Sequence, residues 1–363
     1  MARIVYAVAG EGFGHGTRSQ MIGQRFIDAG HEVMFVSSNK ALSYLRQHFG
    51  DDVKEVFGLS FSFKNGKINR FSTVVQNLSG LPKLRTINKK LFREHFEAFG
   101  PDLVITDFEP FSAFWALRKK VPFISIGHEH LLTHLKLEHR LRNMFTRVTS
   151  EVVTRSNSFK ADAYVIMNFF EAPPKKNTVV TAPPVIRNEL FKFEPSEQDY
   201  IIVYTTTTTA GDRLLGVLNR FRLHKFIVYG LGDGPEQQNC ILKPISTDGF
   251  LEDLAGAKGV IASAGFSLLS ECLYFRKRML LLPVPGQYEQ ITNAYYMHKL
   301  GLGVTSSKLT EAAVQEFFKL LDKPLPDDRR IIWPDNDRFF KVLQDVLNKL
   351  ERPANISLAP QSA

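Results

Sequence analysis

The chain has 363 residues, enough for two domains of ordinary size, and a formal net charge of +9. Its two cysteines, Cys240 and Cys272, are far apart in the sequence, which argues against a disulfide framework or a zinc site and favours a reducing compartment. The sequence shows no apolar stretch long enough to cross a bilayer and no signal-peptide pattern. We therefore expect a cytoplasmic protein, at most peripheral on the inner face of the cell membrane.

The positive charge belongs to the first half of the chain. Residues 1–185 contain 25 Lys and Arg against 16 Asp and Glu, whereas residues 186–363 contain 21 of each. A basic surface of this kind attracts anionic membranes, anionic acceptors and nucleic acid. The alternative is a basic face that is simply solvated.

The first half opens with a strand, a helix and a second strand. An apolar strand at residues 4–9 leads into a glycine-rich loop, a helix from about 18 to 28 and a strand at 32–37. This spacing predicts a parallel sheet. Further strands are expected at 103–107, 123–127 and 163–167, with a long helical pattern at 131–159.

The glycine-rich loop runs from Gly10 to Gly16 and contains His15. Taken alone, it fits the start of a dinucleotide-binding domain. Such a domain needs an acidic residue at the end of its second strand to hold a ribose. Here that strand ends in Ser37-Ser38-Asn39, so we reject hydride transfer.

Residues 61–93 interleave basic and large apolar side chains, including Lys89, Lys90 and Arg93. This mixture suits an anionic membrane surface. A pair of amphipathic helices with a solvated charged face is the alternative. Nucleic acid is not an expected partner, because the sequence shows no recognised nucleic-acid-binding module.

A proline-rich stretch marks the predicted domain boundary. Pro173-Pro174 and Pro183-Pro184 precede residues 186–188, and a second strand series follows at 200–204, 226–229, 260–262 and 280–284. We therefore predict a first domain at 1–185 and a second at 186–335. A last helix at 336–352 precedes a flexible polar tail at 353–363.

Residues 260–296 are the most informative part of the chain. Two apolar strands each end in a polar turn and a helix, and ligands of open parallel sheets bind beyond such strand ends. The small turn Ser263-Ala264-Gly265 would let a phosphate reach the first helix amides. Ser267 could add a bond, and Glu271, one turn later, suits the hydroxyls of a ribose. An ordinary α/β repeat with capped helices is the alternative.

These motifs resemble the donor-binding region of GT-B nucleotide-sugar glycosyltransferases. The resemblance rests on Ser263-Ala264-Gly265, Glu271, Pro285, Glu289-Gln290 and Asn293-Ala294. Within that fold the likeness is to the N-acetylglucosaminyltransferase that makes lipid II and to glycolipid and antibiotic glycosyltransferases. It implies an α/β protein with two Rossmann-like domains, whose parallel sheets face a central cleft and whose last helix crosses back to the first domain.

The resemblance implies an inverting transfer of a sugar, most simply from a UDP-sugar, to a hydroxyl of a glycolipid, an envelope polymer or a small molecule. No resident cofactor is expected. The sequence shows no paired-aspartate motif for a divalent metal at the diphosphate, and His128 and His130 lack further ligands at a recognisable spacing. A metal-independent reaction follows, with amides at 264–266 stabilising the departing diphosphate.

The resemblance also assigns roles to individual residues. His15 is the predicted general base, because imidazole titrates near neutrality, and Asp107 or Glu109 would orient or replace it. The predicted acceptor-binding residues are Gly12, Gly14, His128 and Glu129. The predicted donor-binding residues are Thr207, Thr208, Phe250, Leu251, Ser263, Ala264, Gly265, Phe266, Ser267, Glu271, Gln287, Glu289 and Gln290.

One feature departs from the family pattern. A threonine run at 205–209 replaces the glycine-rich loop of many relatives, which leaves the donor and the strength of its binding open. For Phe250, core packing is the alternative to contact with the base. The first alternative function is a nucleotide-sugar 2-epimerase of the same fold, which should carry more carboxylates around the donor. The second is a non-catalytic nucleotide-sugar binding protein, which His15 argues against.

Overall fold

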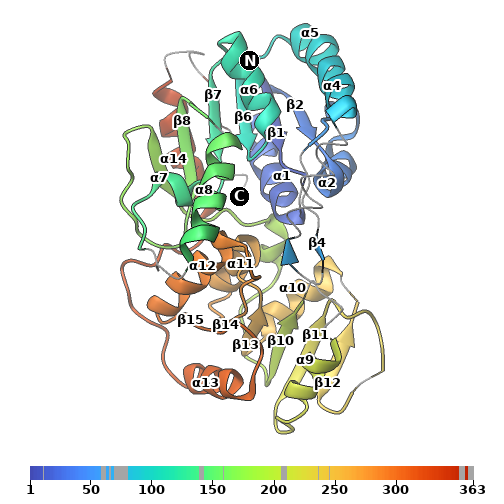
Figure 1. Ribbon diagram of the computed structural model, residues 1–363, viewed down its shortest axis with the longest axis vertical. Helices are drawn as coiled ribbons and strands as arrows, with labels where there is room; N and C mark the ends of the chain where they lie inside the picture. The colour runs from blue at the N-terminus through green and yellow to red at the C-terminus, as the bar shows by residue number, and fades with distance from the viewer. Residues whose placement is uncertain are drawn as a thin grey trace. The chain divides into compact units, whose positions relative to one another are not determined.

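The computed structural model describes residues 1–10, 12–58, 63–64, 67–68, 81–138, 143–157, 159–205, 211–235, 237–244, 246–350 and 356–358. The chain divides into two compact units (Figure 1). Unit 1 comprises Met1–Ser62, Asn69–Arg187 and Asp335–Ala363, and unit 2 comprises Phe63–Ile68 and Asn188–Pro334. In the parts of the chain described, no helix has the length and hydropathy that a bilayer crossing requires.

Unit 1 is built on a sheet of seven parallel strands in the order β3-β2-β1-β6-β7-β8-β9. Its strands are β1 (Arg3–Val8), β2 (Glu32–Ser37), β3 (Val53–Glu55), β6 (Leu103–Asp107), β7 (Phe123–Ile126), β8 (Ala163–Met167) and β9 (Val179–Ala182). The chain moves outward from β1 to β3 and then returns to β6 on the other side of β1. The strand order therefore reverses between β1 and β6, and in such sheets ligands bind beyond the strand ends at that point.

The helices of unit 1 connect these strands, except α14, which follows unit 2 in the chain. They are α1 (Phe13–Asp28), α2 (Asn39–Phe49), the 3-10 turn Gly50–Asp52, α4 (Leu81–Lys90), the π-helical segment Leu91–Phe96, α5 (Glu97–Phe99), α6 (Pro110–Lys119), α7 (Leu131–His134), α8 (Met144–Asn157) and α14 (Asn336–Asn348). The long helical pattern predicted at 131–159 is thus two helices, α7 and α8, among the described residues.

Helix α1 begins five residues earlier than the sequence predicts, at Phe13 instead of about Arg18. Glycines disfavour helix interiors, so the glycine-rich pattern predicts a longer loop than the structure has. At a helix N-terminus, however, the first amides have no intrahelical partner in any case, so glycines are tolerated there. The early start places His15 in the first turn of α1.

The C-terminal helix α14 belongs to unit 1, where it contacts β9. The Asn336 amide bonds both the backbone N–H and the carbonyl of Ile186, each at 2.9 Å. Within the tail predicted to be flexible, residues 356–358 pack on this unit. Ile356 is buried, and the Ser357 carbonyl lies 2.7 Å from Nε2 of His31. The rest of that tail lies outside the described residues.

Unit 2 is built on a sheet of six parallel strands in the order β12-β11-β10-β13-β14-β15. Its strands are β10 (Tyr200–Tyr204), β11 (Lys225–Tyr229), β12 (Cys240–Lys243), β13 (Gly259–Ala262), β14 (Arg278–Leu281) and β15 (Gly303–Thr305). Strand β14 ends earlier than predicted, because the prolines at 283 and 285 have no N–H to continue the ladder. The strand order reverses between β10 and β13.

The remaining elements of unit 2 are helices, a 3-10 turn and a short strand pair. They are the 3-10 turn Asn188–Lys192 and the helices α9 (Gly211–Leu218), α10 (Thr247–Gly256), α11 (Phe266–Tyr274), α12 (Tyr288–Lys299) and α13 (Glu311–Leu321), while β4 (Phe63–Lys64) and β5 (Lys67–Ile68) form a short antiparallel pair. A core of aliphatic and phenylalanine side chains joins the sheet to α9 and α13.

Candidate active site

His15 lies beyond the carboxyl end of β1, where the strand order of unit 1 reverses. Two glycines shape the approach to it. A side chain at Gly10 would collide with Ser38, and Gly12, which precedes α1, has a φ of 83°, a conformation that favours glycine. The backbone therefore turns sharply from β1 into α1 and carries His15 to the sheet edge.

Asp107 is the last residue of β6 and is fully buried. The Arg18 guanidinium donates to both its oxygens at 2.6 Å, and the Ser19 hydroxyl donates at 3.1 Å. Burial alone would raise the pKa of the Asp107 carboxyl, but Arg18, and His15 to a lesser degree, hold it well below its usual range. Asp107 is therefore a fixed negative charge at neutral pH.

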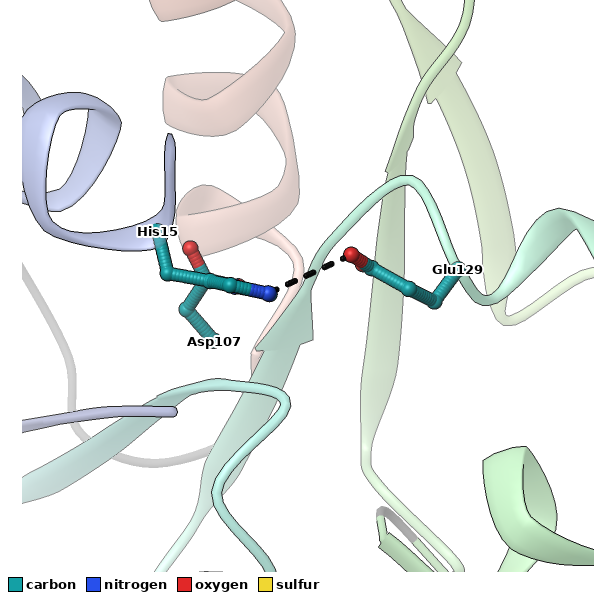
Figure 2. A group of neighbouring side chains, drawn as sticks. All are labelled: His15, Asp107 and Glu129. Atoms are coloured by element: carbon teal, nitrogen blue, oxygen red, sulfur yellow. Dashed lines mark hydrogen bonds and ion pairs between the residues drawn. The ribbon is translucent and has the colours of Figure 1, made fainter. Parts of the chain in front are cut away.

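The His15 ring lies between two carboxylates (Figure 2). Its Nδ1 is 2.8 Å from Asp107 Oδ1, and its Nε2 is 3.4 Å from an oxygen of Glu129, which follows β7. Burial and the Arg18 charge lower the pKa of His15, but the charges of Asp107 and Glu129 and the bond to Asp107 outweigh them and raise it above its ordinary value. The imidazole therefore holds a proton to a higher pH than a free histidine does.

The neighbours of Nδ1 decide which nitrogen of the His15 ring carries the proton. This atom is 2.7 Å from Arg18 Nη2 as well as 2.8 Å from Asp107. Arginine only donates and carboxylate only accepts. A protonated Nδ1 thus donates to Asp107, which leaves Nε2 as the nitrogen that exchanges a proton with a bound molecule.

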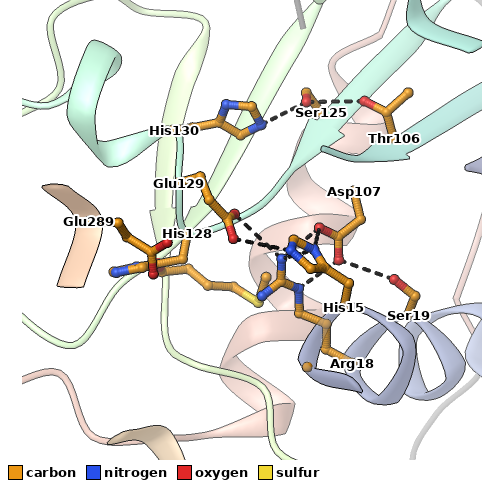
Figure 3. A network of polar contacts seen from close by, with 12 residues as sticks. His15, Arg18, Ser19, Thr106, Asp107, Ser125, His128, Glu129, His130 and Glu289 are labelled. Carbon is orange, nitrogen blue, oxygen red and sulfur yellow. Dashed lines mark hydrogen bonds and ion pairs between the residues drawn. The ribbon is translucent and has the colours of Figure 1, made fainter. Parts of the chain in front are cut away.

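Glu129 joins the same network (Figure 3). Its second oxygen lies 3.5 Å from Arg18 Nη2. Burial raises the pKa of the Glu129 carboxyl, but the charges of Arg18 and His15 more than compensate and lower it. Of the titratable groups in this network, His15 is thus the better proton acceptor near neutrality.

The other predicted residues of unit 1 have different surroundings. Glu109 is buried as the N-cap of α6, where its oxygens accept from the amides of Phe111 and Ser112 at 2.9 and 2.7 Å. Its carboxylate is thus engaged in capping and not in the His15 network. Gly14 lies in the first turn of α1.

His128 and His130 flank Glu129 in sequence but are anchored separately. Nδ1 of His128 lies 2.8 Å from the Met167 carbonyl, and Nε2 of His130 lies 2.8 Å from the Ser125 hydroxyl. Burial lowers the pKa of His130 to about 4. These contacts fix the loop after β7, so that Glu129 points at His15.

His15, Asp107 and Glu129 each offer one possible metal-ligand atom within 4.8 Å of the others. The Arg18 guanidinium already bonds both Asp107 oxygens and reaches Glu129. A cation would have to displace that positive charge from its partners. The arrangement is therefore an ion-pair network built around arginine.

In unit 2, the turn after β13 leads directly into α11. Ala264 is buried, and its carbonyl accepts from the Asn293 side chain of α12 at 3.0 Å. Gly265 precedes the helix, and a side chain built there would meet no atom within 4 Å. The start of α11, with Phe266 buried and Ser263 and Ser267 half-buried, is thus open to an approaching anion.

Polar side chains from α11 and α12 lie around the same strand ends. Glu271 is half-buried one turn beyond Ser267. Gln290 accepts from the Val284 amide at 3.0 Å and donates to Gln287 at 2.6 Å, and Glu289 accepts from Asn293 at 3.3 Å. These bonds fix the loop after β14.

Phe250 and Leu251 lie in α10 and are both buried. The Phe250 ring packs against Tyr204 and Tyr229, at 5.5 and 5.1 Å between centroids, and its amide donates to the Ser246 carbonyl. The side chain is therefore part of the core of unit 2. The predicted contacts of Thr207 and Thr208 lie outside the described residues.

Two residues of the His15 network, Arg18 and Ser19, are not among the predicted site residues, and both hold Asp107. Asn293 belongs to the motif that carries the resemblance, and the structure gives it the role of holding the turn before α11. Arg18 lies three residues after His15, a helical spacing that places the two side chains on one face of α1. Because the sequence predicts a helix start at about Arg18, the shared face of His15 and Arg18 follows only from the observed start at Phe13.

Comparison with known proteins identifies the family. The family model described as glycosyl transferase family 1 matches residues 2–322. An uncharacterized glycosyltransferase of Methanosarcina acetivorans is 25% identical over 345 residues, covering 86% of this chain and 85% of the relative. Another, from Methanosarcina mazei, is 24% identical over 348 residues, with 87% and 91% covered.

Solved structures show the same two-sheet GT-B fold. CalG4, the calicheamicin glycosyltransferase, matches with a TM-score of 0.60 and 15% identity over 96% of this chain and 94% of its own. LpCGTa in complex with UDP matches with a TM-score of 0.60 and 15% identity, over 89% and 91%. MurG of Acinetobacter baumannii matches with a TM-score of 0.55 and 12% identity over the same shares. The predicted fold class is thus confirmed.

Proposed function

Since the chain belongs to glycosyl transferase family 1, we propose that it transfers a hexose from a nucleotide diphosphate donor to an acceptor hydroxyl, with inversion at the anomeric carbon. The observation that supports this function most directly is the position of His15 between Asp107 and Glu129, 2.8 and 3.4 Å away. A UDP-sugar is the first candidate donor, because one structure of the same fold is a complex with UDP.

In the proposed reaction His15 is the general base. Its Nε2 takes the proton of the acceptor hydroxyl while the oxygen attacks the anomeric carbon from the face opposite the diphosphate. The bond from that carbon to the diphosphate oxygen breaks, and the nucleotide diphosphate leaves. Asp107 accepts from Nδ1–H and stabilises the imidazolium that forms, and Arg18 keeps Asp107 ionised and in place.

Unit 2 would bind the donor. The first amides of α11, with the hydroxyls of Ser263 and Ser267, suit the diphosphate, since a helix N-terminus attracts negative charge. Glu271 would accept from ribose hydroxyls, and Gln287, Glu289 and Gln290 would contact the sugar. With these groups stabilising the leaving diphosphate, the proposed reaction needs no metal ion.

Unit 1 would bind the acceptor. Gly12 and Gly14 allow a close approach to the backbone before and within the first turn of α1, and the loop that carries His128 and Glu129 borders His15. A glycolipid or an envelope precursor fits a basic first half, and a small-molecule acceptor is the other class. The proposed location is the cytoplasm, with peripheral contact at the inner face of the cell membrane.

Incubation of the purified protein with a panel of nucleotide sugars and a cell-envelope extract tests this function. Mass spectrometry should find a product heavier by one sugar and the matching free nucleotide diphosphate, with turnover kept after chelation of divalent metals. A donor whose sugar changes while it remains attached to the nucleotide would identify an epimerase. Donor binding without any product from any acceptor class would favour a non-catalytic binding protein.

A further inference from the structure

Helix α8 of unit 1 has an inverted distribution of side chains. Its buried residues are polar, Thr154 and Asn157. Most of its large apolar side chains are instead exposed, Phe145 by 73%, Val148 by 53% and Val152 by 62%, whereas Val153 is half-buried. A helix on a globular protein normally shows the opposite arrangement, with its apolar stripe toward the core. The outer face of α8 therefore has the composition of a buried surface.

The exposed apolar residues of α8 form one stripe. Phe145, Val148 and Val152 follow one another at intervals of three and four residues, which places them on the same side of a helix. Met144, which is 56% exposed, lies on that side too. We call these four side chains the α8 stripe. Contiguous exposed apolar surface of this kind marks an interaction site.

Helix α6 contacts α8 and extends the exposed apolar surface, as their neighbouring positions in Figure 1 show. Phe114 and Leu117 of α6 are exposed, whereas Trp115 and Ala116 beside them are buried. Among the described residues, seven of the eleven exposed large apolar side chains come from α6, α8 or the turn after α8. Exposed apolar residues that are scattered singly over a surface would not be concentrated in one part of unit 1.

The charge around this surface is positive. Helix α6 ends in the exposed side chains Arg118, Lys119 and Lys120, and Lys160 follows α8. On α8 itself Arg147 and Arg155 both pair with Glu151, and Lys119 pairs with Glu97. The basic side chains thus outnumber the acidic ones, in the half of the chain that carries the whole net charge.

We propose that the α8 stripe, with the exposed residues of α6 beside it, docks the protein on an anionic lipid bilayer. Apolar side chains would enter the boundary between headgroups and acyl chains, and the basic side chains would contact the phosphates. A second copy of the chain fits less well, because a two-fold contact would bring the same positive charges together. This docking does not depend on the proposed transfer reaction, since it needs neither donor nor acceptor.

Flotation of the full chain with lipid vesicles tests the proposal. We expect recovery with vesicles that contain phosphatidylglycerol, weaker recovery with pure phosphatidylcholine, and a decrease as salt rises. The double variant Phe145→Ser with Val152→Ser should reduce partitioning at least tenfold, about 1.4 kcal/mol, which is less than the transfer free energy of one buried phenylalanine side chain. Leu223→Ser in unit 2, where the side chain is 93% exposed, is the matched control and should bind as the unchanged protein does.

A fluorescence measurement keeps the test independent of how well the double variant folds. Both native cysteines are buried, so a cysteine introduced by Val148→Cys can be labelled selectively with a dye that reports polarity. The dye should move to a less polar environment on anionic vesicles, and the same dye after Leu223→Cys should not.

Equal flotation of the double variant and the control, or a dye that reports no change, would overturn the proposal. Loss of binding only after charge reversal at Lys89, Lys90 and Arg93 would assign the membrane to that other surface. If the unchanged protein does not bind vesicles and the double variant differs from it in oligomeric state, the stripe contacts a second copy of the chain.

Discussion

The two units carry polar residues at equivalent places, beyond the carboxyl ends of the strands where the strand order reverses, but the two edges differ in charge. The edge of unit 1 holds an arginine, two carboxylates and a histidine that bond one another, with Asp107 fully buried. The edge of unit 2 holds backbone amides, hydroxyls, amide side chains and the carboxylates of Glu271 and Glu289 around a glycine that is open to solvent. The first arrangement fixes a titrating group, whereas the second presents both donors and acceptors of hydrogen bonds to a ligand.

This difference predicts that the two edges have separate roles, which mutations can test. Changes at the edge of unit 1 should alter turnover, stability or pH dependence and leave nucleotide affinity unchanged. Changes at the edge of unit 2 should weaken nucleotide binding first.

The largest expected effect is that of His15→Ala. Loss of a general base typically lowers turnover by about a hundred- to ten-thousandfold, while affinity for a uridine diphosphate, which unit 2 would bind, should be kept. Steady-state kinetics and calorimetry on the same preparation measure both quantities. If affinity collapses together with turnover, His15 is a binding or structural residue. If turnover survives, the base is another group, and Glu129, which faces Nε2 of the His15 ring, becomes the next residue to change.

The next effect concerns stability. Asp107→Asn removes the main partner of the buried Arg18, and an uncompensated buried charge typically costs about 3–5 kcal/mol. Urea unfolding should show this loss, and Asp345→Asn on the exposed face of α14 should change the free energy of unfolding far less.

The same carboxylate sets a pH dependence of stability. The pKa of Asp107 is lower in the folded protein than in the unfolded chain. Its contribution is therefore present above the unfolded pKa of about 3.9 and is lost as the pH falls below it. In the Asp107→Asn variant, the free energy of unfolding should lack this dependence on acid pH. If its pH dependence is the same as that of the unchanged protein, Arg18 is paired with another group.

A smaller effect is expected in unit 2. Glu271→Ala should weaken binding of a uridine diphosphate by about 1–3 kcal/mol, since it removes charge-assisted bonds to ribose hydroxyls. Calorimetry measures the affinity, and Glu252→Ala, at an exposed position of α10, is the control. Equal affinity of a folded Glu271 variant and the unchanged protein would remove this residue from the site.

The smallest effect, and the one that sharpens the comparison most, is that of Glu129→Gln. Glu129 contributes to raising the pKa of His15, and the base must be neutral to act. Turnover falls on the acid side of that pKa, so removing the charge should move the acid limb of the turnover profile to lower pH. Glu171→Gln, at an exposed position, should leave the limb in place. If the acid limb of the turnover profile moves in neither Glu129→Gln nor Glu171→Gln, a group other than His15 controls it.

The sequence by itself indicated most strands of the two sheets and the local pattern of one of the two edges. Apolar runs and glycine turns are local patterns, so β2 and β6 were predicted at their observed bounds. The small turn before α11 and Glu271 lie within ten residues of each other, so a local pattern is enough to predict this part of the proposed donor site. The helix amides that it would use need no distant partner.

The resemblance implies that Asp107 or Glu109 orients His15, but only the tertiary structure decided between them and added Arg18 and Glu129. Arg18 and Asp107 are 89 residues apart in the chain, and they meet because β6 pairs with β1 at the point where the strand order reverses. The same folding turns Glu109 into the cap of α6 and points Glu129 at the ring. It also leaves the apolar side of α8 exposed, because a helical pattern in the sequence states which residues share a face but not which face meets the core.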